Sequence, residues 1–152
     1  MEKERNMVTQ IEFCEGVIES SRFITEMVNL EHGAQDIFIG KVRQHNQNRD
    51  VVGIEYEIFT DLAHKVLSEL CNEARNTIDP NLDFSIVHRS GYLSVGETSV
   101  LIIASSKHRD EAFRACRFII EEIKHRVPIW KQEHYTDGKS EWVQGHALCQ
   151  HN

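Results

Sequence analysis

Short runs of alternating apolar and polar residues predict strands in the first half of the chain. They span residues 8–13, 34–42 and 51–59, and successive side chains of a strand point to opposite faces of its sheet. The polar stretch 43–50 (RQHNQNRD) lies between the last two runs. Because no core would accept it, we expect a loop there. The run over 51–59 is expected to bury one face, made of Val52, Ile54, Tyr56 and Ile58.

Apolar residues at helical spacing predict three helices. Their expected first residues can cap a helix start, and they are Ser20 or Ser21, Thr60 or Asp61, and Ser105 or Ser106. The helices are expected to end near Gly33 and before Pro80 and Pro128, since proline disfavours a helical residue before it. The three buried sides are Phe23, Ile24, Met27 and Val28; Leu62, Val66, Leu70, Ala74 and Ile78; and Ala112, Cys116, Ile119, Ile120, Ile123 and Val127.

The second half of the chain contains four further strand patterns. They cover residues 82–88, 98–104, 129–135 and 142–143, and turn residues surround Gly91 and Gly96 between the first two. The run VLIIA within 98–104 is typical of a strand buried on both faces. Strands and helices are intermixed without strict alternation, which favours an α+β fold with a mixed or antiparallel sheet.

Length and composition point to one globular domain. The chain has 152 residues, 40% hydrophobic and 27% charged, so we expect a single domain over 1–152 with flexible ends at about 1–7 and 146–152. No apolar run is long enough to span a membrane, and the charged start MEKERNMVTQ is unlike a secretory signal. Four widely spaced cysteines and nine histidines show no metal-ligand spacing. We therefore expect a cytoplasmic protein without a metal or cofactor, and no membrane association.

Positive charge is concentrated in two segments of an acidic chain. The net charge is −7, which argues against a nucleic-acid partner. Residues 41–49 contain three basic side chains and no acidic one, and residues 107–131 contain seven basic and four acidic. If the fold brings the two segments together they form an anion site. The alternative is that both are solvated surfaces.

Two places in the basic segments could carry chemistry. Residues 105–109 (SSKHR) lie at an expected helix start, where free N–H groups can hold a phosphate or carboxylate. Lys124 and Lys131 flank Pro128, and a lysine near a second cation loses affinity for its proton, so it can act as an acid, base or nucleophile. Strand alternation places Lys131 opposite Trp130, so that Lys131 faces solvent or a cleft if Trp130 faces the core. The alternative for residues 105–109 is a serine cap that binds no ligand. The alternative for Lys124 is that its charge only stabilises the C-terminal end of the helix.

Several blocks of the sequence form a recognisable set of motifs. The segment 38–46 (FIGKVRQHN) has the pattern F-x-G-x-V-R-x-H-N. Further blocks are 55–57 (EYE), 87–91 (VHRSG), 105–109 and 123–133 (IKHRVPIWKQE), and the last contains the most specific motif, P-x-W-K-x-E. In this order the blocks resemble those of the large, catalytic subunit of molybdopterin synthase, and the resemblance covers about residues 33–143.

The resemblance implies an α/β-hammerhead fold and a sulfurtransferase. That family inserts two sulfurs into cyclic pyranopterin monophosphate to form the dithiolene of molybdopterin. The sulfur comes from a small ubiquitin-like carrier subunit with a C-terminal Gly-Gly thiocarboxylate, and a homodimer binds one carrier at each end of a heterotetramer. By this resemblance Lys124 and Lys131 are catalytic, and the substrate-binding residues are Lys41, Val42, Arg43, His108, Arg109, Gln132 and Glu133. Of these, Arg43, His108 and Arg109 would hold the phosphate.

One departure and two alternatives remain at this point. Family members often carry an arginine after the W-V strand that reaches the neighbouring subunit, and here the position is His146. Either His146 makes that cross-subunit contact or this edge of the site is built differently. The chain could instead be a non-catalytic docking module for a ubiquitin-like carrier tail, a role that requires no paired lysines. It could also be a sensor of a phosphate ligand, which would bind that ligand without any protein partner.

Overall fold

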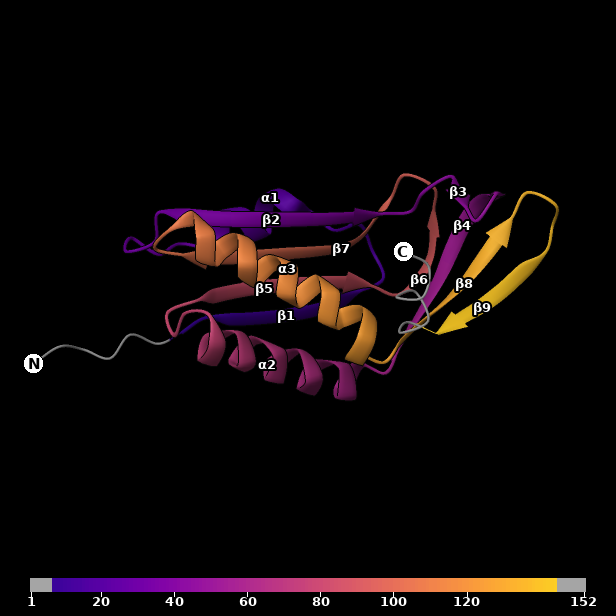
Figure 1. The fold of residues 1–152 in the computed structure, drawn as a ribbon. Coiled ribbons are helices and arrows are strands. Elements are labelled where there is room, and N and C mark those ends of the chain that lie inside the picture. The colour runs from indigo at the N-terminus through magenta and orange to yellow at the C-terminus, as the bar shows by residue number, and fades with distance from the viewer. Residues whose placement is uncertain (1–6, 145–152) are drawn as a thin grey trace, which may run out of the picture.

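A computed structural model describes residues 7–144 as two adjoining sheets with three helices (Figure 1). The first sheet has the order β1 (Thr9–Cys14), β5 (Asp83–Arg89), β7 (Thr98–Ser106) and β2 (Ala34–Lys41). The second has the order β3 (His45–Asn46), β4 (Arg49–Ile58), β8 (Ile129–Tyr135) and β9 (Ser140–Gln144), and β6 (Gly91–Ser94) also pairs with β4. The helices are α1 (Ser20–Glu26), α2 (Thr60–Thr77) and α3 (Arg109–Arg126). Only β1 and β5 pair in parallel among the described strands.

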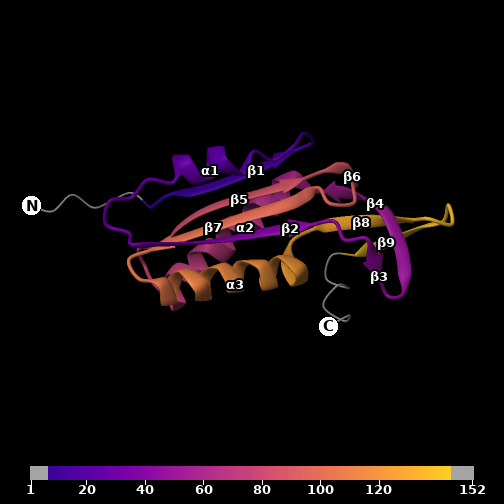
Figure 2. The same cartoon turned by 90° about the horizontal axis from the view of Figure 1, so that it is seen from above.

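The first sheet carries the main core because helices cover both of its faces. Ile86 and Ile102 pack with α2 and α3 on one side, and Val87 and Leu101 pack with α1 on the other. Figure 2 shows α1 and α3 on opposite sides of this sheet. The run VLIIA of β7 is buried throughout, as its apolar composition predicts.

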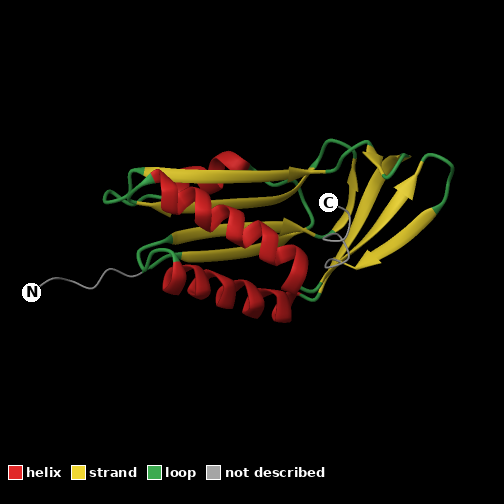
Figure 3. Cartoon of the chain, in the orientation of Figure 1, coloured by secondary structure: helices red, strands yellow, loops and turns green. Residues whose placement is uncertain are grey.

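The expected α+β class, with mixed and antiparallel pairing and about three helices, is confirmed (Figure 3). Two strands were not expected. The stretch 43–50 is not a plain loop, since β3 pairs with the start of β4 around a turn whose residues Gln47 and Asn48 have positive φ. The expected turn near Gly91 contains β6. This strand is only four residues long and mixed in composition, so no alternating pattern marks it in the sequence.

A bulge in β4 changes which face Val52 occupies. The pairing with β8 shifts register between Val51 and Gly53. The extra residue reverses the alternation, so Val51 is buried and Val52 is exposed. The expectation that Val52 shares a buried face with Ile54 is therefore wrong.

The helices differ from expectation at their starts and in part of their buried sides. Their N-caps are Glu19, Phe59 and His108, and none makes a side-chain capping bond. Helix α1 ends at Glu26, well before Gly33. Ser105 and Ser106 belong to β7, because the buried strand continues to them. Three expected core residues are exposed. Ile24 of α1 and Leu62 of α2 lie outside the packed stripe of their helix, and Val28 lies beyond the end of α1.

Within residues 7–144, no helix is both long and apolar enough to cross a membrane. The expected flexible ends fall almost wholly on residues 1–6 and 145–152, which lie outside the described residues. His146 lies there too.

Candidate active site

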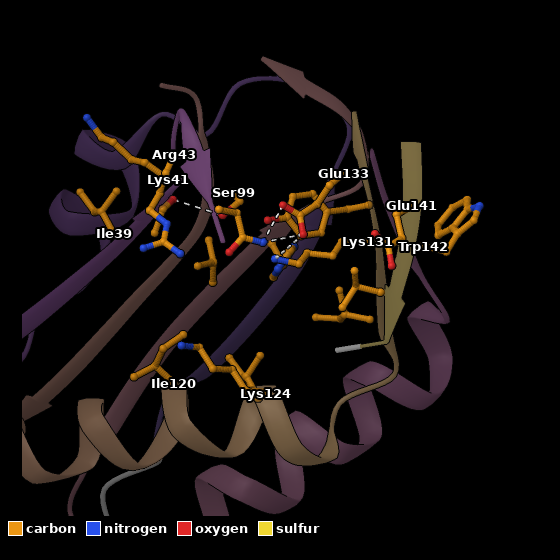
Figure 4. A pocket seen from close by; sticks show the side chains of 18 of the residues that line it. Ile39, Lys41, Arg43, Ser99, Ile120, Lys124, Lys131, Glu133, Glu141 and Trp142 are labelled. Carbon is orange, nitrogen blue, oxygen red and sulfur yellow. Dashed lines mark hydrogen bonds and ion pairs between the residues drawn. The ribbon is translucent and has the colours of Figure 1, made fainter. Parts of the chain in front are cut away.

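A cavity of about 930 Å³ opens where the two sheets meet the C-terminal end of α3. Figure 4 shows its side chains arriving from separate elements: Lys41 from the end of β2, Arg43 from the segment that follows it, Lys124 from α3, and Lys131 from β8. Its charged wall consists of Lys41, Arg43, Lys124, Lys131, Glu133 and Glu141. Neutral lining residues include Asn46, Tyr56, Ser99 and Tyr135. A cavity of this size suits a small-molecule ligand.

Strand alternation in β8 directs Lys131 into this cavity. Ile129, Lys131 and Glu133 all line it, as residues two apart on a strand must share a face. The Lys131 side chain is only 13% exposed. Trp130 is half-buried on the opposite face, so Lys131 faces a cleft without Trp130 facing the main core.

Burial is the main reason why the pKa of Lys131 lies below its usual value. The carboxylate of Glu133, 3.9 Å from the Lys131 amine, acts in the other direction. The positive charges of Arg43 and Lys124 lower the pKa further, because a like charge disfavours the protonated amine. A lysine in this environment releases its proton more readily than one in water.

The fold brings together part of the two basic segments and leaves the rest on the surface. Lys41 and Arg43 come from the first segment, and Lys124 and Lys131 from the second. Other cations are paired outside the cavity. Arg114 and Arg117 contact acidic residues one turn away, and Arg126 pairs with Glu73 and Glu122. The anion-site interpretation therefore applies to Lys41, Arg43, Lys124 and Lys131.

Four expected site residues do not line the cavity of their own chain. His108 and Arg109 lie at the start of α3. Lys124 lies 15 residues further along the helix, about 22 Å away at the ordinary helical rise. Val42 is buried among Val51, Ile54, Leu93 and Tyr135. Gln132 lies on the opposite face of β8 and donates a hydrogen bond to Ser140 Oγ at 2.9 Å.

The expected anion cradle at residues 105–109 is occupied by internal contacts. Ser105 Oγ lies 2.6 Å from His32 Nδ1, and Ser106 Oγ donates to the carbonyl of His108 at 2.6 Å. Because α3 begins only at Arg109, the two serines do not present free N–H groups of a helix start. The cations at 107–109 remain, without the serine cradle.

The structure adds residues that the sequence reasoning missed as site components. Asn46 Nδ2 donates to both carboxylate oxygens of Glu133, at 2.7 and 2.8 Å. The rings of Tyr56 and His88 meet edge to face with centroids 5.1 Å apart. All three line the cavity. The signal was available, since Asn46, Tyr56 and His88 lie inside the motif blocks 38–46, 55–57 and 87–91.

His88 is held neutral at the base of the cavity. Burial lowers its pKa to about 4, and its Nδ1 lies 2.8 Å from the carbonyl oxygen of Arg89. A carbonyl oxygen can only accept, so Nδ1 carries the proton. Burial also raises the pKa of Tyr56. The cavity is thus uncharged at its bottom, around His88 and Tyr56, and cationic at its rim. Among the described residues, no group of His, Cys, Asp or Glu is arranged to hold a metal ion.

Comparisons with known proteins point to one family. Residues 14–126 match the family model described as MoaE protein. A molybdopterin synthase catalytic subunit from Synechococcus elongatus is 50% identical over 119 residues, which cover 78% of this chain and 72% of the relative. One from Pyrococcus abyssi is 45% identical over 109 residues, covering 72% of each chain. The crystal structure of molybdopterin synthase from Staphylococcus aureus has a TM-score of 0.81 at 36% identity, covering 87% of this chain and 95% of that one.

Proposed function

Since this chain belongs to the MoaE family of molybdopterin synthase catalytic subunits, we propose that the cavity is where it performs the family's sulfur insertion. The enzyme acts in molybdenum cofactor biosynthesis and forms the dithiolene of molybdopterin. The observation that carries the proposal is the convergence of Lys41, Arg43, Lys124 and Lys131 on one cavity in a chain of net charge −7.

The substrate we assign to the cavity is cyclic pyranopterin monophosphate. Arg43 supplies a guanidinium, which binds phosphate through two parallel hydrogen bonds. Lys41, the last residue of β2 and two residues before Arg43, adds a second positive charge at the rim. The bottom of the cavity, around Tyr56 and His88, is uncharged and can therefore hold the uncharged ring system of a pterin.

Lys124 and Lys131 are proposed to act on the reacting carbons. Lys131 has the lowered pKa and faces the cavity, so it can exchange a proton with the substrate or hold a carbonyl carbon transiently. The positive charge of Lys124, like that of Arg43, makes the neutral form of Lys131 more accessible.

The sulfur donor is proposed to be the small ubiquitin-like carrier subunit. Its C-terminal Gly-Gly thiocarboxylate must reach the cavity from outside. The tail is anionic, and the cationic rim attracts it while the acidic remainder of the surface repels other acidic proteins.

A second copy of the chain is proposed to complete the phosphate site. Strand β2 is at the edge of the first sheet, and its residues Ile37, Phe38 and Ile39 are partly exposed apolar side chains. Such an edge favours pairing with another chain. Phe38 and Ile39 also line the cavity, so a copy docked there would border it. His108 and Arg109 would then reach the phosphate from the neighbouring subunit.

Incubation with thiocarboxylated carrier and cyclic pyranopterin monophosphate tests the function directly. Mass detection of the dithiolene product is the expected result. Binding of the carrier without product at any substrate concentration would leave only the docking-module alternative.

Mixing two inactive variants tests the shared site. We expect Arg109→Ala and Lys131→Ala each to lose activity. If Arg109 acts across subunits, their mixture regains about a quarter of the wild-type activity, because half of the dimers are mixed and each has one intact site. No recovery after subunit exchange would place Arg109 and Lys131 in the same subunit's site or remove Arg109 from it.

A further inference from the structure

The carboxylate of Glu133 is buried in the cavity wall and held mainly by an amide. Its side chain is 3% exposed, and Asn46 Nδ2 lies 2.7 and 2.8 Å from its two oxygens. An ionised carboxylate only accepts hydrogen bonds, so the amide must present its NH₂ group. The amine of Lys131 lies 3.9 Å from Glu133 Oε1. That distance allows electrostatic attraction but is too long for a hydrogen bond.

The short hairpin between β3 and β4 fixes Asn46 in this position. Asn46 pairs with Arg49 across a two-residue turn, Gln47-Asn48, in which both residues have positive φ. This is the type I′ conformation, one of the two that two-residue hairpins favour. The guanidinium of Arg49 then stacks 3.4 Å from the ring centroid of Tyr135 on β8. The hairpin is thereby attached to the strand that carries Lys131 and Glu133.

We propose that Asn46 is a positioning residue that holds the Glu133 carboxylate back from Lys131 and so leaves the lysine amine free to meet the substrate. Among residues 7–144, Lys131 is the one cation within 4 Å of the Glu133 carboxylate, so it is the partner left when the Asn46 donor is removed. A buried carboxylate that loses a hydrogen bond turns to the donor that remains. A closed Lys131–Glu133 pair would occupy the amine. The benefit to catalysis rests on the role proposed for Lys131 above; the geometric claim does not.

This arrangement predicts opposite effects from the two partners on the protonation of Lys131. A closed pair favours the charged amine, so removing Asn46 raises the pKa of Lys131, whereas removing the charge of Glu133 lowers it further. The other titratable groups around Lys131 stay the same in both variants. They are the cations Lys41, Arg43 and Lys124, the neutral Tyr56, His88 and Tyr135, and Glu141 on β9.

The test is an NMR titration of the Lys131 side chain in the full-length free protein, with the signal assigned from a Lys131→Arg variant. We expect Asn46→Ala and Asn46→Leu to raise the pKa of Lys131 by about one unit, and Glu133→Gln to lower it. The Leu side chain has the branched shape of Asn and lacks the N–H groups. Asn48→Gly is the matched control, since it alters the same hairpin at an exposed residue whose positive φ glycine accepts.

The outcomes separate this inference from the function on which it bears. An unchanged or lowered Lys131 pKa in both Asn46 variants would overturn it, and so would loss of the folded state in both, because Asn46 would then support the hairpin rather than the carboxylate. The titration needs no substrate, so it stands even if no dithiolene forms. In the complete assay, the pH profile of turnover should move to higher pH in the Asn46 variants and to lower pH in Glu133→Gln.

Discussion

The helix-covered core of the first sheet and the cavity face of β8 bury different kinds of side chain. In the helix-covered sheet, β5 and β7 are enclosed by apolar residues of α1, α2 and α3. In the second sheet, β8 buries Glu133 and most of Lys131 against an amide and other charged groups. Apolar burial stabilises a fold, whereas buried charges rarely do. The difference indicates that the helix-covered core provides stability and the cavity face of β8 provides chemistry.

The largest effect is expected when the amine of Lys131 is removed from the cavity. Lys131→Ala should lower turnover by about 10²–10⁴-fold, the contribution of a positioned acid or base, while the protein stays folded. Lys131→Met keeps the aliphatic stem and should be equally inactive. The exposed Lys139, in the turn after β8, provides the control Lys139→Ala. Product formation by a folded Lys131→Ala protein at near the wild-type rate would remove Lys131 from the chemistry.

The opposite change, in the helix-covered core, should affect stability first. Leu70 of α2 is fully buried, so Leu70→Ala should lower the free energy of unfolding by about 2–5 kcal/mol. Leu62 lies on the same helix and is exposed, and Leu62→Ala should change it by less than about 0.5 kcal/mol. Denaturant titration measures both. Similar losses in the two variants would mean that the packed stripe of α2 is not the one described.

The same contrast explains what could be predicted from the sequence. The unbroken apolar run of β7 and the alternation around Lys131 have strong local patterns, and the structure places both as they indicate. The hairpin at 45–50 has none, because its polar residues obtain their partners from distant segments. Arg49 reaches the ring of Tyr135 and the carboxylates of Asp137 and Glu141, and no local pattern records such contacts.

The candidate site was predicted less completely than the fold. Motif blocks identify residue types but not their distance from one another. His108 and Arg109 are therefore grouped with Lys124 by resemblance, while helix α3 holds them at its other end. Gln132 is adjacent to Glu133 in sequence but points to the other face of β8, as alternation requires. Asn46 lies inside the motif block 38–46, but its contact with Glu133 depends on the β3–β4 hairpin, which no local pattern indicates.

A pH-dependent stability experiment tests the buried polar base of the cavity. The pKa of His88 is about 4 in the folded chain and near 6.5 in an unfolded one. Between these values the unfolded state binds a proton that the folded state does not, so stability should fall as the pH is lowered from about 6.5 to 4. The loss approaches about 3 kcal/mol.

The matched variant for this measurement is His88→Asn, whose amide can still donate to the Arg89 carbonyl. Its stability should depend less on pH over the same window. The carboxyls of Glu73 and Glu97, whose pKa values are lowered by hydrogen bonds, titrate in both proteins and cancel in the difference. Parallel stability curves for the two proteins between pH 6.5 and 4 would show that His88 is protonated in the folded chain.

The smallest expected effect concerns the attraction of the carrier tail to the cationic rim. Lys41 and Arg43 are exposed at the cavity, and exposed charges are screened beyond about 8 Å at physiological ionic strength. Binding of an intact carrier should therefore weaken a few-fold as salt rises from low to physiological, mainly through slower association. A carrier that lacks its last two glycines should bind more weakly at low salt and show a smaller salt dependence. Equal affinities of the two carriers at both salt concentrations would mean that the tail does not enter the cavity. The sulfur for the reaction at Lys131 would then have to come from another donor.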